Sequence, residues 1–293
     1  MYKLRKILWA TDGSKQSVNA LKYSKKISEK FNSKTIGIHV IRDLNKKIFD
    51  ILNMKLNFEE MIAGERDTYG KFFVKIEKEF NKQNRVFEHY IACGKTDEEV
   101  LTYSNKNKID LIVLGHKGAS SDEGMFSGSS TNKIVRSADI PVLVVNMNYK
   151  KRLSNIKRIV VPINLTEDLV SALDYAVFLA STLGAEVSVL YVQEFISYSY
   201  EMPIIILDDM KKYFDNKLNK LTKKYKNKNV KISTHVTEFL NPYMGILRHC
   251  EKIRPDLIVM NTHERKGLKK YFLGSVTEKI INDMPCPVLT LKP

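Results

Sequence analysis

Two glycines and a Gly-Ser pair in the first half of the chain have the types and the spacing of a phosphate-binding loop. Gly115 is followed by Gly118, and nine further residues lead to residues 128–130, Gly-Ser-Ser. The loop follows segment 110–114, which is typical of a buried strand, and precedes segment 131–136, which is typical of a helix. Glycine lets backbone N–H groups approach an anion, and the first turn of a helix adds unpaired donors and a positive dipole end. The spacing therefore predicts that phosphate binds between this strand and this helix.

The pattern recurs in altered form near the end of the chain. Asn261 and Glu264 stand where the first copy has its leading glycines, and Gly274-Ser275 follows after nine residues. Each replacement adds a side chain where the backbone must approach the anion, and Glu264 adds a negative charge that repels phosphate. We therefore expect this copy to bind phosphate poorly. The positive charges that would suit a smaller anion or a different ligand are those of Arg265, Lys266, Lys269 and Lys270.

The two halves of the chain follow one plan. Segment 6–14 matches segment 158–166 with a difference of 152 in residue number, and Asp110 matches Asp256 with a difference of 146. A net deletion of six residues within 43–90 accounts for the change. Matches at a constant spacing over so many positions indicate a duplicated domain.

Each half alternates apolar strands with helices, so the predicted fold class is α/β. It consists of two doubly wound five-stranded parallel-sheet domains, 1–148 and 154–293, separated by the basic stretch 148–154. Such sheets bind ligands at the carboxyl ends of their strands, where the winding reverses. We therefore expect Asp12 and Gly115 to meet at one edge. In the first half, strands are expected at 5–11, 35–41, 86–92, 110–115 and 141–146, and helices at 16–31, 59–82, 96–107 and 128–137.

The last strand of each half indicates how the halves associate. Segments 141–145 and 287–291 are apolar and would form exposed sheet edges if they stayed unpaired. The sequence therefore predicts an internal pseudo-dimer in which the halves pair through these strands. Association of two whole chains is left open.

Composition limits the classes of protein to consider. The 293 residues are 43% hydrophobic, which favours a globular chain, and no apolar run reaches the roughly 18–20 residues of a membrane helix. The net charge of +15 comes largely from lysines spread along helices, without an aromatic-interleaved platform, so we expect no specific nucleic-acid binding. Three widely spaced cysteines, and a first strand with no signal peptide before it, favour a cytoplasmic location.

These motifs together resemble the universal stress protein family in its tandem-domain form. The first half carries the family's pattern G-x2-G-x9-G-[ST] without a departure, and segment 10–14, Ala-Thr-Asp-Gly-Ser, is similar to the family's acidic first-strand motif. Segment 94–100 with the strand at 110–114 is similar to its third-helix and fourth-strand region. The resemblance implies an adenine nucleotide alpha hydrolase-like fold and covers nearly the whole chain.

The resemblance also implies an ATP site, with Mg²⁺, in the first domain. Asp12 would contact the adenosine, Val40 would offer backbone groups to adenine, and Leu114 with Gly115 would line the ribose and phosphate side. The phosphates would be held by the loop and the helix start. The complete set of expected contacts is Ala10, Thr11, Asp12, Val40, Leu114, Gly115, His116, Gly118, Gly128, Ser129, Ser130 and Thr131. In the second domain Asn164 replaces the acid, so ATP is expected to bind there poorly or not at all.

Several of these residues also have a purely structural interpretation. Asp12 suits the cap of a turn, Gly128 with Ser129 suits a helix start, and His116 suits a spacer within the loop. Gly94-Lys95-Thr96 resembles the end of a P-loop, but the glycine that a P-loop needs five residues earlier is His89. The histidines that lack metal-ligand spacing, and are expected to be structural or exposed, are His39, His89, His235 and His249.

No arrangement of catalytic residues or metal ligands stands out in the sequence. We therefore expect a cytoplasmic stress-response protein that binds ATP and acts as a sensor or regulator of an unidentified protein. One alternative is an enzyme that hydrolyses ATP slowly or transfers an adenylyl group. Another is an interaction scaffold that holds no nucleotide.

Overall fold

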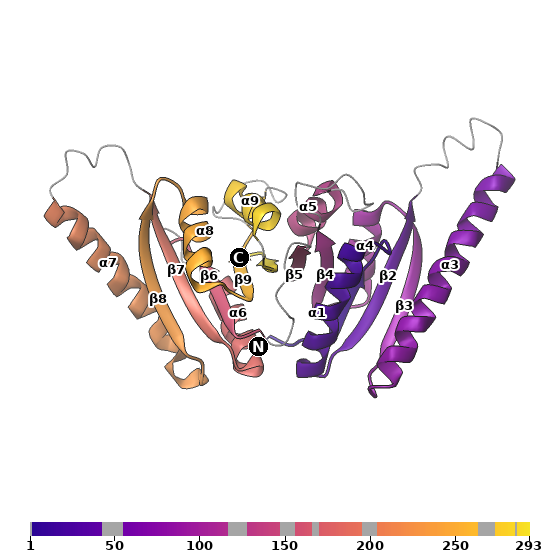
Figure 1. Cartoon of the computed structure of the whole chain (residues 1–293), viewed down its shortest axis with the longest axis horizontal. Helices are drawn as coiled ribbons and strands as arrows, with labels where there is room; N and C mark the ends of the chain where they lie inside the picture. The colour runs from indigo at the N-terminus through magenta and orange to yellow at the C-terminus, as the bar shows by residue number, and fades with distance from the viewer. Residues whose placement is uncertain are drawn as a thin grey trace. The chain divides into compact units, whose positions relative to one another are not determined.

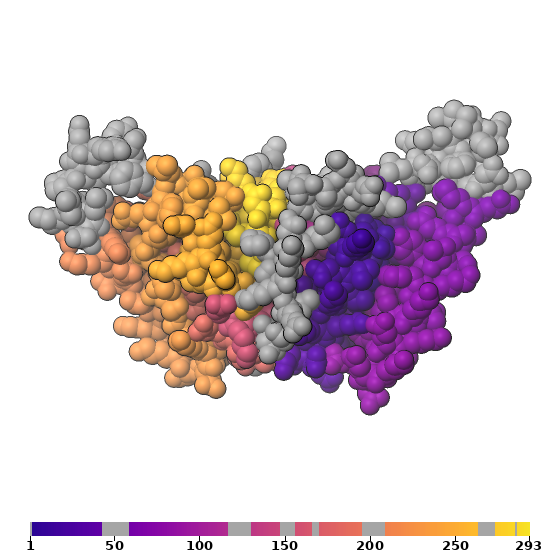
Figure 2. Space-filling model, in the orientation of Figure 1, coloured from indigo at the N-terminus to yellow at the C-terminus, as the bar shows by residue number. Residues whose placement is uncertain are grey.

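The chain is seen here as a computed structural model that describes eight stretches of residues. The chain divides into two compact units, Lys3–Met147 and Asn148–Pro293. The space-filling view shows the described residues of each unit packed into a continuous body (Figure 2). The described stretches are 2–42, 55–116, 128–146, 156–165, 170–194, 204–262, 273–284 and 286–293, without the side chains of 55–58, 128–129 and 204–208.

The first unit is a five-stranded parallel sheet with helices on both faces (Figure 1). Its strands lie in the order β3-β2-β1-β4-β5, so the winding reverses between β1 and β4. The strands are β1 (Lys6–Ala10), β2 (Lys34–Arg42), β3 (Phe87–Gly94), β4 (Leu111–His116) and β5 (Val142–Asn146). The helices are α1 (Lys15–Phe31), α3 (Lys55–Asn81), α4 (Thr96–Lys106) and α5 (Gly128–Ser137).

Helices α1 and α3 share one face of this sheet, and Trp9 shows how they meet over β1. Its indole N–H donates to the Ser17 carbonyl in α1 at 2.7 Å, and its ring packs edge-on against Phe73 of α3 at 6.2 Å. Trp9 is fully buried, as are nearly all residues of β1 and β4, because helices cover both faces of the sheet. Ser14 begins α1 by accepting the Ser17 N–H at 3.3 Å.

The second unit repeats the first. Its strands lie in the equivalent order β8-β7-β6-β9-β10, and all of the pairings are parallel. The strands are β6 (Arg158–Pro162), β7 (Glu186–Glu194), β8 (Ile232–Phe239), β9 (Leu257–Asn261) and β10 (Val288–Leu291). The helices are α6 (Ser171–Leu183), α7 (Ile204–Thr222), the 3-10 helix η3 (Lys223–Lys228), α8 (Pro242–Ile253) and α9 (Ser275–Asp283). The predicted α/β class, with two doubly wound five-stranded parallel sheets, is confirmed.

One carboxylate in each unit ties together the beginnings of two neighbouring strands. Asp110 accepts the backbone N–H groups of Lys6 and of the residue before it, at 2.8 and 2.7 Å. Asp256 makes the same pair of hydrogen bonds with Arg158 and the residue before it, at 2.9 and 3.0 Å. The matched aspartates of the duplicated sequence therefore make the same structural contacts in both units.

Among the helices that the structure describes, none is long and apolar enough to cross a membrane.

Candidate functional site

The turn after β1 is held by the side chain of Thr11. The Thr11 N–H continues the sheet by donating to the Ile38 carbonyl at 2.9 Å, and its hydroxyl lies 2.8 Å from the Ser17 hydroxyl in α1. The same hydroxyl accepts the Gly13 N–H at 3.1 Å. Gly13 has a φ of +74°, a backbone conformation that favours glycine. Thr11 is 1% exposed, so its side chain serves as a buried anchor for the turn.

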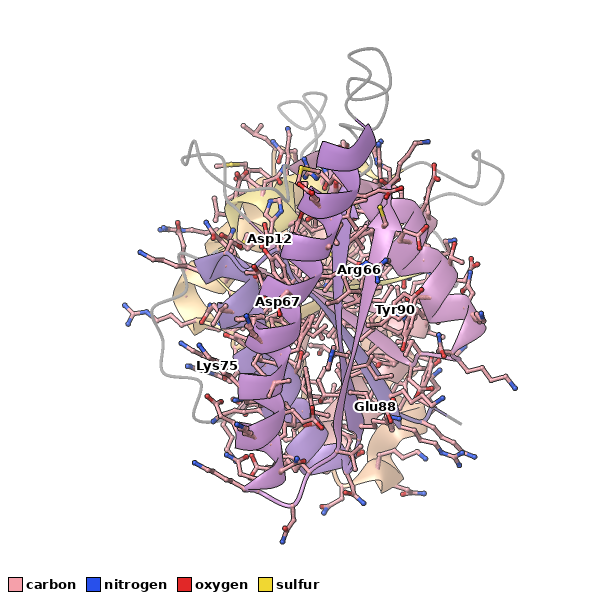
Figure 3. All side chains as sticks on the ribbon, turned by 90° about the vertical axis from the view of Figure 1, so that its right-hand side faces the viewer. Asp12, Arg66, Asp67, Lys75, Glu88 and Tyr90 are labelled. Atoms are coloured by element: carbon pink, nitrogen blue, oxygen red, sulfur yellow. The ribbon has the colours of Figure 1, made fainter. Side chains whose placement is uncertain are left out.

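Asp12 caps this turn and stands at the carboxyl edge of the sheet. Its Oδ1 accepts the Ser14 N–H at 3.1 Å, as expected from the structural interpretation of the residue. The side chain is half-buried, and Figure 3 shows Asp12 beside α3, near the level of Arg66 and Asp67. A carboxylate fixed by a turn has a defined direction, so the cap and a ligand contact are compatible roles.

Gly115 is required by the packing of α1 against β4. A Cβ atom at this position would lie 2.5 Å from the Gln16 carbonyl carbon and 2.6 Å from the Ser17 nitrogen. These are backbone atoms, which cannot move aside as a side chain can. Gly115 therefore brings the start of α1 into direct contact with the end of β4, a structural role that the loop pattern did not predict.

Leu114 and Val40 complete this edge of the sheet. Leu114 lies opposite Ala10 in the parallel pairing of β4 with β1. Val40 lies two residues beyond Ile38, the partner of Ala10 on β2, and is 6% exposed. The strand registers thus bring the expected adenosine contacts to one edge, where the strand order reverses.

The start of α5 lies after β4 in the chain and carries the expected phosphate contacts. α5 begins at Gly128, and Thr131 in its first turn is fully buried. The Thr131 hydroxyl has no hydrogen-bond partner among the residues that the structure describes. Ser130 is half-buried, whereas Gly118 and the side chain of Ser129 lie outside the described part. His116 ends β4 and is 1% exposed.

Three residues near Asp12 were not predicted to belong to the site. The Tyr69 hydroxyl of α3 donates to the Asp12 carbonyl at 2.8 Å. His39 Nδ1 lies 2.9 Å from the Thr11 carbonyl, and Glu65 lies 3.1 Å from His39 Nε2. The rings of His39 and Tyr69 stack at 3.3 Å. The four-residue spacing of Glu65 and Tyr69 put both on one helix face, but nothing in the sequence linked that face to β1.

The corresponding edge of the second unit is built differently. Asn261 replaces Gly115, and its side-chain carbonyl accepts the Ser171 hydroxyl at 2.7 Å. The Asn261 backbone carbonyl accepts the hydroxyl of Thr277, the counterpart of Thr131, at 3.2 Å. Side-chain hydrogen bonds therefore occur in the second unit at the position where the first unit has a glycine against the α1 backbone.

Among the residues that the structure describes, no group of three or more His, Cys, Asp and Glu side chains is placed to hold a metal ion.

The strand order, the winding reversal and the glycine at the end of β4 define a doubly wound α/β protein with two equivalent units. The sequence pattern of the Universal stress protein family matches residues 3–146 and 155–292. The chain belongs to this family, with one family domain in each unit.

Individual relatives align with single units. "Universal stress protein MJ0531" of Methanocaldococcus jannaschii is 33% identical over 141 residues, which is 46% of this chain and 82% of that protein. "Universal stress protein MJ0577" of the same organism is 29% identical over 156 residues, 50% of this chain and 95% of that protein. The chain thus spans most of the length of each of these relatives.

Solved structures resemble the chain over both units. A universal stress protein from Archaeoglobus fulgidus covers 98% of this chain and 98% of its own, with a TM-score of 0.66 and 20% identity. A putative universal stress protein from Pseudomonas aeruginosa covers 99% and 94%, with a TM-score of 0.68 and 14% identity. At these identities the likeness concerns the fold.

Proposed function

We propose that the first unit binds ATP at the carboxyl edge of β1, β2 and β4, and that the protein acts as a nucleotide-dependent sensor or regulator in the stress response. The observation that carries the proposal is the buried Thr131 hydroxyl at the start of α5. This hydroxyl has no hydrogen-bond partner among the described residues, and an oxygen of a bound phosphate would supply one. The half-buried Asp12 carboxylate stands at the same edge of the sheet, just after β1, which lies beside β4, the strand that precedes α5.

The residues of the first unit fit the parts of the nucleotide. Asp12 and Val40 would meet the adenosine, and Leu114 with Gly115 would line the ribose. The first turn of α5 would donate N–H and hydroxyl groups to the phosphates, since its dipole favours anions. Mg²⁺ bound to ATP would neutralise phosphate charge. The phosphate-side contacts are completed by His116, Gly118, Gly128, Ser129, Ser130 and Thr131.

Release of bound small molecules is the first test. The full-length chain is purified without added nucleotide and denatured, and the released compounds are identified by mass spectrometry. ATP or a related adenine nucleotide, at close to one molecule per chain, supports the proposal. Absence of nucleotide, together with no ATP binding in calorimetry, favours the nucleotide-free scaffold. Steady release of ADP or AMP on incubation with ATP favours the slow enzyme.

A matched pair of variants locates the site. Gly128→Glu places a carboxylate at the start of α5, where like charges repel phosphate. Gly274→Glu makes the same change at the equivalent place before α9. Calorimetry with Mg-ATP should show a loss of at least about 100-fold in affinity for Gly128→Glu, equivalent to about 3 kcal/mol. The affinity of Gly274→Glu should match that of the unchanged chain. Equal effects, or no effect of Gly128→Glu, would reject the proposed site.

A further inference from the structure

Two consecutive carbonyls in the turn after β1 are held by side chains from outside the turn. The Thr11 carbonyl accepts a hydrogen bond from His39 Nδ1 at 2.9 Å, and the Asp12 carbonyl accepts one from the Tyr69 hydroxyl at 2.8 Å. Hydrogen bonds to neighbouring carbonyls fix the peptide planes between them. The direction of the Asp12 side chain therefore depends on α3 as well as on β1.

Glycine at position 13 allows α3 to approach so closely. A Cβ atom on Gly13 would lie 2.9 Å from the Tyr69 hydroxyl oxygen. Tyr69 is half-buried, and burial raises its pKa, with further increases from the negative charges of Asp12 and Glu65. The hydroxyl thus keeps its proton and remains a donor at physiological pH.

The contact between His39 and Glu65 requires one additional proton. A carbonyl oxygen only accepts, so the hydrogen bond to Thr11 places a proton on His39 Nδ1. His39 Nε2 then faces Glu65 Oε1 at 3.1 Å. Neutral Nε2 and an ionised carboxylate both accept hydrogen bonds, so they attract each other only when one of them carries a further proton. The His39 side chain is 1% exposed and the Glu65 side chain is 28% exposed, so this proton can exchange with water through Glu65.

In the described part of the chain, the groups around His39 lie on α3, on β3 and in the turn after β1. Glu65 and Tyr69 face it from α3, and Asp12 lies one residue beyond the Thr11 carbonyl at the end of β1. The residue opposite His39 on β3 is Ile91, which does not titrate. The contact between His39 and Glu65 therefore joins β2 to α3 beside the turn that carries Asp12.

The second unit lacks this arrangement. The counterpart of Tyr69 in α7 is Phe214. Each of them lies four residues before a fully buried side chain of its helix, Phe73 in α3 and Leu218 in α7. Phe214 packs on the ring of Tyr191 at 4.6 Å, where the first unit has Tyr69 stacked on His39. By the same spacing, the counterparts of His39 and Glu65 are Tyr191 and Met210. The polar support thus occurs in the unit that has the acidic residue in its turn, whereas the unit with Asn164 has apolar and aromatic side chains instead.

We propose that Glu65 and Tyr69 are positioning residues of the nucleotide site. Tyr69 acts directly on the turn, and Glu65 acts through the proton that it shares with His39. This inference rests on the proposed ATP site. Loss of the hydrogen bond between Glu65 and His39 removes a contact that joins α3 to β2. The turn then loses support, and nucleotide affinity falls.

The affinity of two Glu65 variants for Mg-ATP tests the role of Glu65. Calorimetry on the full-length chain should show affinity about five- to tenfold lower for Glu65→Ala, because alanine leaves His39 Nε2 without its partner. Glu65→Gln should keep the affinity of the unchanged chain, because a glutamine amide donates to neutral Nε2 without any additional proton. Asp67→Asn is the matched control, since Asp67 is an exposed residue of α3 that pairs with Lys71, and it should follow the unchanged chain.

Tyr69→Phe separates the two positioning residues. Removal of the hydroxyl leaves the stacked ring but deletes the hydrogen bond to Asp12. Affinity should fall about five- to tenfold. An unchanged affinity would remove Tyr69 from the proposal, and a Glu65→Ala affinity equal to that of the unchanged chain would overturn the role of Glu65.

Nitrogen NMR of the ligand-free chain gives a readout that needs no nucleotide. The ring of His39 should show a protonated Nδ1, because the Thr11 carbonyl only accepts a hydrogen bond. A tautomer protonated only at Nε2 would contradict the geometry. Failure of the unchanged chain to bind ATP would overturn the proposed function and this role together. Binding of ATP with an affinity that neither Glu65→Ala nor Tyr69→Phe alters would overturn only the present inference.

Discussion

At the scale of the residue, Asp12 has a structural role that can be separated from a role in binding. Asp12→Asn keeps a side-chain oxygen that can accept the Ser14 N–H, but it removes the negative charge. We expect the free energy of unfolding to change by less than about 0.5 kcal/mol, whereas ATP affinity falls about tenfold. Urea unfolding and calorimetry measure the two effects. An unchanged affinity would show that Asp12 is only the cap of the turn.

His249 provides a pH-dependent contribution to stability. Burial, and then the positive charges of His235 and Lys252, lower its pKa to about 4, while the unfolded value is about 6.5. Between these values the unfolded chain binds a proton that the folded chain does not, so the free energy of unfolding falls as the pH is lowered from about 6.5 to about 4. Urea unfolding at pH 7 and pH 5 should show a larger loss for the unchanged chain than for His249→Gln. Equal losses would contradict this account.

At the scale of the element, replacing glycine by alanine should change the free energy of unfolding in opposite directions at two positions. Gly115→Ala forces α1 away from β4 and should lower the free energy of unfolding by about 1–3 kcal/mol. Gly70 lies in the middle of α3 with no atom within 4 Å of its would-be Cβ. Gly70→Ala should therefore raise the free energy of unfolding by about 0.5–1 kcal/mol. Urea unfolding measures both, and a Gly115→Ala chain as stable as the original would refute the close contact.

The apolar periodicity of the sequence predicted the helices and strands well, because burial determines both the spacing of apolar residues and the place of each element. The strand expected at 110–115 is observed as Leu111–His116, and the helix expected at 16–31 as Lys15–Phe31. The edge formed by Ala10 and Leu114 followed from parallel pairing alone. The support of the turn by Tyr69 and His39 could not be predicted, because it depends on how closely a distant helix approaches β1. The sequence pattern likewise predicts Gly115 to be a loop glycine, because its contact with α1 exists only in the folded chain.

At the scale of the whole molecule, the association of the two units through segments 141–145 and 287–291 remains a prediction from the apolar sequence of these strands. Co-expressed fragments 1–148 and 154–293 should co-purify, because each would otherwise expose an unpaired strand edge. Size-exclusion chromatography with mass measurement checks this. Two fragments that fold and remain monomeric when mixed would show that the last strands do not join the halves.

The paired hydrogen bonds of Asp110 and Asp256 have a practical consequence for measurement. The same carboxylate geometry occurs twice in one molecule, at one temperature, pH and protein concentration. Alanine substitution at either aspartate removes the same two contacts, so any difference in the response reports on the surrounding unit and on what that unit has bound. Saturating ATP should protect the Asp110→Ala chain against proteolysis more than the Asp256→Ala chain. The duplication thus supplies an internal reference against which ligand effects in the first unit can be calibrated.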